Sequence, residues 1–249
     1  MSQPPLLAID GLSKRFGSTV AIDDASFTVA AGEVVALLGR SGAGKSTLFR
    51  CLTQLARPDS GDVRIDGRSM IGLSPRALRK ARQSIGFVFQ QFNLIGRMSA
   101  LENVLGGRIG HAPTWRVILR RFTVEDRRLA LEALDGVGLL SRAYQRADSL
   151  SGGQQQRVAI ARVIAQQCRV LLADEPVASL DPATSETVLE ALRDAARRHG
   201  VAVLCSLHQT DLALRYADRI VAMQAGRIML DRPAGAVSPA ELDALYGAG

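Results

Sequence analysis

A glycine-rich segment between two apolar stretches constrains this chain more than any other feature of its sequence. The segment comprises Gly39, Arg40, Ser41, Gly42, Ala43, Gly44, Lys45, Ser46 and Thr47. It fits the pattern G-x-x-x-x-G-K-[ST], with a predicted buried strand before it (Glu33–Leu38) and a predicted helix after it (Lys45–Leu55). Glycines let the backbone turn its N–H groups inward and the helix adds its positive end, so the loop is suited to hold phosphate groups.

Two side chains of this segment have chemical roles in such a loop. Lys45 can reach the β- and γ-phosphates of a bound nucleotide, and the Ser46 hydroxyl can ligate Mg²⁺. Only three of the 31 basic residues are lysines, and the other 28 are arginines. The lysine at position 45 is therefore informative, because a phosphate loop needs a compact ammonium there. The alternative is a chance glycine turn, and the strand–loop–helix context argues against it.

The composition is that of a globular protein without a membrane-spanning segment. Of the 249 residues, 47% are hydrophobic and 22% are charged, and the length suffices for one large or two small domains. No apolar run approaches the ~18 residues of a membrane span, and the N-terminus has no basic leader. We therefore expect other chains to supply any membrane-spanning part. The net charge of +7 allows an anionic membrane surface or nucleic acid as a neighbour.

Short apolar runs alternate with amphipathic helical stretches, which predicts an α/β fold with a largely parallel core. Two early runs are predicted as strands of an accessory sheet, Leu6–Asp10 and Ala21–Val29. The later predicted strands are Asp62–Ile65, Ile85–Gln90, Val170–Ala173 and Val201–Ser206. The later predicted helices are Gly152–Gln167 and Pro182–His199. Residues from about 99 to 140 have a mostly helical pattern that interrupts the alternation, so we expect a helical subdomain there.

Two adjacent acids follow the predicted strand Val170–Ala173 and are candidates for metal binding and catalysis. Neighbouring strand residues point to opposite sides, so Asp174 and Glu175 should have different roles. Asp174 is placed to hold Mg²⁺, directly or through water, and Glu175 is placed to polarise an attacking water as general base. The alternative is a strand that simply meets solvent. The phosphate loop makes that alternative the weaker one, because P-loop NTPases need an acid at such a strand end.

A second candidate anion site lies at the start of the helix predicted after residue 151. Ser151 is a natural N-cap, and Gly152 and Gly153 before Gln154 expose backbone N–H groups at the helix N-terminus. Taken alone, this is an ordinary helix cap, worth only ~0.3–1 kcal/mol to an anion at an exposed site. It becomes important when several N–H groups close over a desolvated phosphate.

With these features, the chain resembles the ATP-binding subunits of ABC transporters over nearly its whole length. Leu150–Gln154 is the LSGGQ signature of that family, and the order phosphate loop, LSGGQ, LLADE is its order. The resemblance implies ATP and Mg²⁺ as ligands. It implies one ABC ATPase domain over 1–249, with a P-loop NTPase (RecA-like) core, an antiparallel β accessory sheet and a helical subdomain inserted at about 91–165. It also implies that two copies pair head-to-tail, so that Ser151, Gly152 and Gly153 act on ATP at the other copy's loop.

Further positions match the family residue by residue, and the resemblance gives each a role. Gln90 matches the Q-loop glutamine, which contacts Mg²⁺ and hinges the helical subdomain; on its own it is a polar strand end. Asp181 matches the D-loop that links the two ATP sites, and it is also a natural N-cap. His208 matches the switch histidine near the γ-phosphate. Phe16 matches the adenine-stacking position, with a surface or core aromatic as an equal alternative.

The stretch from Arg108 to Phe122 indicates a subfamily. Its residues 108–116 and 120–122, with those around Ser151 and His208, resemble phosphonate-importer ATPases. The resemblance implies a peripheral ATPase on the cytoplasmic face of the cell inner membrane that drives phosphonate uptake. Its implied partners are a second copy of itself, transmembrane permease subunits and, indirectly, a periplasmic substrate-binding protein. This is analogy and not site chemistry, because none of these residues needs to touch a phosphonate.

Other assignments stay open at this point. Another ABC system, such as amino-acid uptake or lipoprotein release, is one alternative. A non-transport ABC ATPase of DNA repair or translation commonly has coiled-coil or zinc insertions or a second cassette; the sequence has no such features, so we expect no nucleic acid partner. A nucleotide kinase fits the phosphate loop but not LSGGQ.

Six arginines between 108 and 128 are predicted to form a solvated basic face or a surface toward membrane subunits and anionic headgroups.

Overall fold

Six strands form the larger of two sheets in the computed structural model, which describes residues 4–113, 115–116, 119 and 121–247. Their order across the sheet is β10 (Arg227–Pro233), β9 (Arg219–Gln224), β3 (Val34–Leu38), β8 (Ala202–Leu207), β7 (Val170–Asp174) and β6 (Ile85–Val88). The strands from β9 to β6 are parallel, and β10 is antiparallel to β9. Every residue of β3 and β8 is buried, as expected for parallel strands covered on both faces. The predicted parallel core is confirmed.

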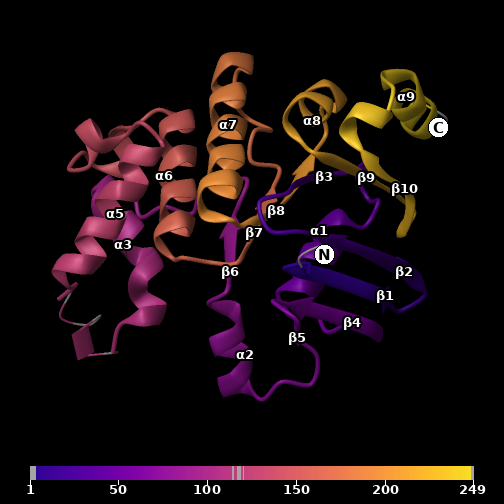
Figure 1. Cartoon of the computed structure of the whole chain (residues 1–249), viewed down its shortest axis with the longest axis horizontal. Coiled ribbons are helices and arrows are strands. Elements are labelled where there is room, and N and C mark those ends of the chain that lie inside the picture. Colours follow the sequence, from indigo (N-terminus) through magenta and orange to yellow (C-terminus); the bar gives the residue numbers. More distant parts are fainter. Residues whose placement is uncertain (1–3, 114, 117–118, 120, 248–249) are drawn as a thin grey trace.

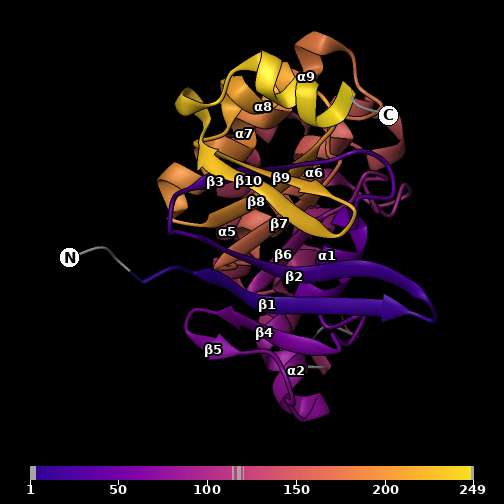
Figure 2. The same cartoon turned by 90° about the vertical axis from the view of Figure 1, so that its right-hand side faces the viewer.

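Alternate residues of β3 pack on opposite faces of this sheet and divide the interior into two cores. Ala36 belongs to a core that includes α7 (Pro182–His199) and α8 (Thr210–Tyr216). Leu37 belongs to the other core, which includes α1 (Lys45–Leu52) and the smaller sheet. The α1 helix therefore lies between the two sheets, while α7 and α8 cover the outer face of the larger one (Figures 1 and 2).

The smaller sheet is antiparallel and confirms the predicted accessory sheet. Its order is β2 (Thr19–Val29), β1 (Leu7–Phe16), β4 (Ser60–Ile65) and β5 (Arg68–Ser69). β1 continues beyond the predicted strand because Gly11 adopts φ 58 in a bulge, where the pairing register shifts between Ile9 and Leu12. The strand bends past the glycine and places Phe16 at its far end.

A helical region lies beyond β6, at the left of Figure 1. It corresponds to the stretch of about 99–140 that is predicted to be mostly helical and to the predicted helix Gly152–Gln167. It contains α3 (Ala100–Leu105), the 3₁₀ helix η1 (Gly106–His111), α5 (Val124–Gly136) and α6 (Gly152–Ala165). α6 contacts α3 and α5 as well as α7 and β6, so it joins the region to the larger sheet. Capping boxes at Ser99, Thr123 and Ser151 set where α3, α5 and α6 begin.

One of the six arginines predicted for a solvated or membrane-facing surface is buried instead. Arg108 is only 8% exposed; its Nε donates to Asp126 Oδ1 at 2.9 Å, and its Nη1 donates to the Ala165 carbonyl at 3.0 Å. The prediction was wrong for this residue, because its guanidinium satisfies acceptors of α5 and α6 inside the helical region. Arg120 and Thr114, which belong to the predicted surface and subfamily stretch, lie outside the described residues.

Several short elements are not evident in the sequence patterns. They are α2 (Pro75–Arg82), α8, α9 (Pro239–Gly247), strands β9 and β10, and the 3₁₀ turns η2 (Leu140–Arg142), η3 (Ala147–Ser149) and η4 (Ala234–Ala236). Their apolar periodicity is too brief to distinguish a helix or strand from a loop. Among the helices of the described part of the chain, none has the length and apolar content needed to cross a bilayer.

Candidate functional site

The loop from Gly39 to Gly44 connects β3 to α1 and lies against neighbouring backbone at both of these glycines. A Cβ added at Gly39 would lie 2.6 Å from the carbonyl oxygen of Met223, and one at Gly44 would lie 2.4 Å from that of Ala21. Gly44 also has φ 107, a conformation that residues with side chains disfavour. Space therefore requires glycine at both ends of this loop, and conformation also requires it at Gly44.

Lys45 begins α1 and lies almost completely buried beneath the loop, with 5% of its surface exposed. Its Nζ donates to the carbonyl oxygens of Gly39, at 2.5 Å, and Arg40, at 3.3 Å. Burial lowers the pKa of Lys45, while the negative charges of Glu175 and Asp174 act in the opposite direction. The Lys45 side chain is thus held in place by two carbonyl groups with little solvent around it, as close binding of an anion requires.

A cavity of about 220 Å³ opens over this loop. It is lined by Arg40–Thr47, by Thr19–Ala21 of β2 and by Glu175. Eight of the nine predicted residues of the phosphate loop therefore border one space together with the predicted general base. The ninth residue, Gly39, does not line the cavity, but its carbonyl oxygen accepts a hydrogen bond from Lys45 Nζ and so helps to fix Lys45 in place.

The two acids and His208 form a connected group at the carboxyl ends of β7 and β8. The Ser206 hydroxyl donates to Asp174 Oδ1 at 2.7 Å and accepts from the backbone N–H of Glu175 at 2.9 Å. Glu175 has φ 49, so the chain leaves the strand there, and its Oε1 contacts His208 Nε2. The different surroundings of the two acids come from this backbone turn and not from the strand alternation that the sequence predicted.

The strand order explains which predicted residues meet. β8 lies between β3 and β7, so the phosphate loop, Glu175 and His208 share the carboxyl edge of the sheet. β6 is the next strand beyond β7, and Gln90 follows it as an exposed residue. Gln90 is not among the described residues that line the cavity, so this geometry does not bring it to the loop.

The second predicted anion site is a helix start capped by its own residues. Ser151 Oγ accepts from the backbone N–H of Gln154 at 3.4 Å, and Gln154 Oε1 accepts from that of Ser151 at 3.0 Å. None of residues 151–154 is among the described residues that line the cavity over the phosphate loop. In Figure 1, α6 and α1 lie on opposite sides of β6 and β7. The two predicted phosphate-binding elements therefore do not line one cavity within this chain.

The start of α7 lies directly against this helix start. An added Cβ at Gly153 would lie 2.0 Å from Thr184 Cγ2, so the two helices touch there. Asp181 Oδ1 accepts from the backbone N–H of Thr184 at 3.0 Å, which confirms the predicted N-cap. Hydrogen bonds from Thr184 hold the pKa of the Asp181 carboxyl below its usual value. The start of α7, which directly follows the predicted D-loop, therefore packs against the predicted signature segment.

A family model described as ABC transporter matches residues 22–178, more than half of the chain. The chain belongs to the ABC transporter family. The matched stretch begins within β2 and ends shortly after Glu175, so it includes the phosphate loop, the LSGGQ segment and both acids. The family resemblance and the predicted ATPase are thereby confirmed.

Two relatives show how close the similarity of this ABC ATPase is. The hypophosphite import ATP-binding protein HtxD of Stutzerimonas stutzeri is 51% identical over 240 residues, which cover 96% of this chain and 70% of that protein. The phosphonates import ATP-binding protein PhnC 1 of Rhodopseudomonas palustris (strain ATCC BAA-98 / CGA009) is 48% identical over 241 residues, which cover 97% of this chain and 89% of that protein.

Solved structures of ABC cassettes share the fold. The dimeric structure of the bacterial ABC transporter cassette MJ0796 matches with a TM-score of 0.78 and 33% identity, over 92% of this chain and 98% of that one. The ADP conformation of the cassette MJ1267 matches with a TM-score of 0.85 and 26% identity, over 99% of this chain and 100% of that one. This agreement over nearly whole chains confirms the predicted P-loop NTPase fold.

Phe16 of this ABC ATPase lies beside the cavity over the phosphate loop. It pairs across the β1–β2 turn with Thr19, which lines the cavity, and half of its surface is exposed (50%). Lys14 Nζ lies 5.2 Å from the ring centroid. The ring is therefore a surface aromatic at the cavity edge and not a core residue, which removes one of the alternatives left by the sequence.

Ser206 is a site residue that the sequence patterns do not single out. It is fully buried in β8, and its hydroxyl connects the Asp174 carboxylate to the backbone N–H of Glu175. A lone hydroxyl in the apolar run that ends at Leu207 is the signal that could have marked it, because buried polar groups need partners.

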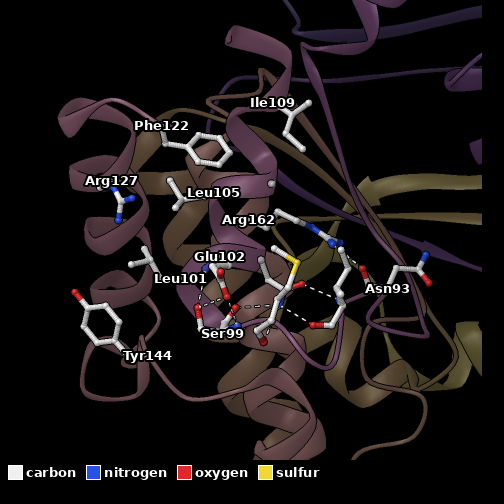
Figure 3. Close-up of a pocket in the computed structure, with 14 residues that line it drawn as sticks. Asn93, Ser99, Leu101, Glu102, Leu105, Ile109, Phe122, Arg127, Tyr144 and Arg162 are labelled. Carbon is white, nitrogen blue, oxygen red and sulfur yellow. Dashed lines mark hydrogen bonds between the residues drawn. The ribbon is translucent and has the colours of Figure 1, made fainter. Parts of the chain in front are cut away.

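A larger cavity, of about 720 Å³, lies in the helical region (Figure 3). Its lining includes Leu101, Leu105 and Phe122, and Figure 3 shows these side chains between Tyr144 on one side and Arg162 on the other. Polar side chains, among them Ser99 and Glu102, line the same groove beside the apolar ones, and such a mixed concave surface is suited to receive another molecule. No sequence pattern predicts it, because its lining comes from several separate segments.

Proposed function

We propose that this ABC ATPase couples ATP binding and hydrolysis to the uptake of phosphonates through partner membrane subunits. The cavity in which Arg40–Thr47 and Glu175 meet carries the ATPase half of this proposal. The N–H groups of the loop and the buried Lys45 ammonium bind the phosphates, because together they replace solvent with fixed positive charge. Phe16 stacks on the adenine at the edge of the cavity.

Glu175 is the general base in this proposal. Its carboxylate borders the cavity and contacts His208, which holds it in place. Glu175 takes a proton from the water that attacks the γ-phosphorus, and we assign to His208 a contact with the γ-phosphate. The bond between the γ-phosphorus and the bridging oxygen breaks, and ADP and phosphate remain.

We assign the metal ligands to Ser46, Gln90 and Asp174. Hydroxyl, amide and carboxylate oxygens are hard donors that suit Mg²⁺. Ser46 lines the cavity, and Ser206 holds the Asp174 carboxylate, whose negative charge acts to raise the pKa of Lys45, so both acceptors belong to the surroundings of the loop and fit the ion. When bound, Mg²⁺ neutralises part of the phosphate charge. For Gln90, a shift of the segment that follows β6 toward the cavity is required.

We further propose that each ATP site is shared by two copies of the chain. Ser151, Gly152, Gly153 and Gln154 of one copy would close over ATP held by the loop of the other. The absence of these residues from the described lining of the cavity supports this, as does the dimeric form of the similar cassette MJ0796. Asp181 would pass changes between the sites, because α7 touches the signature at Gly153.

The same proposal assigns the whole of 1–249 to one ABC ATPase domain, with residues of about 91–165 as the inserted helical subdomain. The groove of about 720 Å³ would receive a segment of the transmembrane permease subunits, and Gln90 would hinge the subdomain. The chain would then be peripheral, on the cytoplasmic face of the inner membrane. A periplasmic substrate-binding protein would act on it only through the permease, and we propose no nucleic acid partner.

The cargo assignment rests on the relatives named for import of phosphonates and hypophosphite. Growth tests it directly. A strain that lacks this gene, with no second importer, should fail to grow on a phosphonate as sole phosphorus source and should grow normally on phosphate. A wild-type copy should restore growth and a Lys45→Ala copy should not. Unimpaired growth on phosphonate would remove phosphonate from the proposal; failure on hypophosphite alone would name that cargo instead.

A further inference from the structure

The helix α2 presents a row of cations that ATP hydrolysis does not use. Arg76, Arg79 and Lys80 are all exposed, and no acidic residue occurs in the helix. Among the ion pairs of the described residues, none includes any of the three. Acids of the adjacent β4 and its turns are already engaged with Lys14, Arg64 and Arg169. The three cations therefore lack a carboxylate partner within the described part of this chain.

The inner side of α2 is firmly held. Leu78 and Ala81 pack against the core beneath the smaller sheet. Arg82 Nε donates to the carbonyl of Thr53 at 2.9 Å, and its Nη2 donates to that of Gln54 at 3.1 Å. A fourth cation of the helix is thus used for attachment, and Arg76, Arg79 and Lys80 are presented on a rigid support.

The exposed side of α2 forms a hollow suited to an anionic group. Ser74, Arg76, Arg79, Lys80 and Gln83 line a space of about 480 Å³ there. Arginine and lysine side chains around one recess attract phosphate groups, since each adds a charge-assisted hydrogen bond donor.

The position of α2 indicates where such groups come from. A hollow of about 440 Å³ runs from Arg79 to His111 of η1 and includes Arg162, which also lines the groove in Figure 3. The cationic surface is thus continuous with the groove proposed for the permease. Phe89, which is 38% exposed, lines the same hollow and adds an apolar surface. In Figures 1 and 2, α2 forms the lower end of the molecule, away from α8 and α9.

We propose that α2 binds the headgroups of anionic phospholipids and thereby holds the ATPase against the bilayer beside its permease. The proposal rests on the proposed function to the extent that the groove faces a membrane protein. An anionic lipid surface fits the observations because it supplies many phosphates to a row of cations without requiring a matching arrangement of acids. Exposed cations next to apolar side chains are typical of surfaces that bind a membrane without spanning it.

Binding to protein-free vesicles tests this without ATP or permease. The purified chain is sedimented with vesicles of phosphatidylcholine alone and with vesicles containing a third phosphatidylglycerol. We expect binding only to the anionic vesicles, with loss at 0.5 M salt. The triple variant Arg76→Gln, Arg79→Gln, Lys80→Gln should bind about 100-fold more weakly, about fivefold per cation, since each contributes about 1 kcal/mol near an anionic surface. Its basal ATPase rate should be unchanged, which shows that it folds.

The matched control removes the same charge elsewhere, through Arg142→Gln, Arg197→Gln and Arg198→Gln, and should bind anionic vesicles within threefold of wild type. Equal losses in both triple variants would reduce the effect to net charge and overturn the proposal. Complete displacement by soluble glycerol phosphate would make α2 a site for free anions instead. If α2-dependent binding appears only with vesicles that carry the permease, the partner is that protein and not lipid. None of these outcomes depends on the phosphonate growth test.

Discussion

The phosphate loop and the LSGGQ helix start are both glycine-containing helix N-termini, yet they are built for different tasks. The loop covers a buried Lys45 and borders a cavity of about 220 Å³. At the signature, Ser151 is exposed and the helix start is closed by a capping box with Gln154. In the proposed function, the loop is a nearly complete anion site, and the signature helix start adds N–H groups to an anion held by the loop of another copy. Similar local sequence thus gives two unequal structures, which we propose are the two halves of one site.

The largest effect should come from the loop side. Lys45→Ala removes the buried cation, and we expect steady-state phosphate release to fall by roughly 1000-fold, about 4 kcal/mol of barrier. Lys80→Ala is the control, because that ammonium is exposed on α2, and its rate should stay within twofold. If Lys45→Ala keeps more than a tenth of the wild-type rate, the loop is not the stronger half of the site.

The next effect separates binding from chemistry within the loop half. Glu175→Gln keeps the shape of the side chain but cannot accept a proton, so ATP binding should persist while turnover falls by ~100-fold, about 2.7 kcal/mol. Equilibrium binding and single-turnover hydrolysis measure the two quantities. Near-normal hydrolysis in this variant would remove Glu175 as the base.

The sequence predicts the residues of this site that follow apolar strands, but not the interactions that depend on how two strands pair. Lys45, Ser46 and Glu175 follow apolar runs, and parallel strands bring such positions to one edge, so pattern and elementary geometry suffice. The turn at Glu175 and the bridge through Ser206 could not be predicted, because both depend on how β7 and β8 pair.

The same limit applies to the fold outside the site. The parallel core, apart from β9, and the accessory sheet could be predicted because their strands are long or continuously apolar. Arg108 looks like a surface residue in the sequence, and it is buried only because Asp126 and the Ala165 carbonyl meet it from two other helices. The groove in Figure 3 likewise arises from segments far apart in the chain.

The signature side can be tested through its contact with α7. Gly153→Ala should lower the free energy of unfolding by about 1–3 kcal/mol, because the new Cβ would lie 2.0 Å from Thr184 Cγ2. Adding Thr184→Ser removes that methyl group and should restore most of the loss, whereas Thr184→Ser alone should change little. Urea unfolding of the four proteins of this cycle measures the coupling. Additive effects would show that the close contact does not constrain the signature helix.

The smallest effect concerns the cap itself. Ser151→Ala removes the acceptor for the Gln154 N–H and should lower the free energy of unfolding by about 1 kcal/mol. Ser46→Ala, its counterpart in the loop, should leave the free energy of unfolding unchanged, because Gly44 and not a side chain caps α1. Urea unfolding without nucleotide separates the two. Equal losses would mean that side-chain caps hold both helix starts, and the proposed difference between the loop and the signature would then be wrong.

Purified heterodimers show whether the loop of one copy and the signature of the other complete each other. One heterodimer pairs a Lys45→Ala chain with a Ser151→Arg chain; the other pairs wild type with a chain that carries both changes. Sharing between copies leaves one intact site in the first heterodimer and none in the second, provided that one intact site suffices for turnover. We therefore expect ATPase activity in the first heterodimer and almost none in the second. Activity in the second and none in the first would contradict sharing between copies.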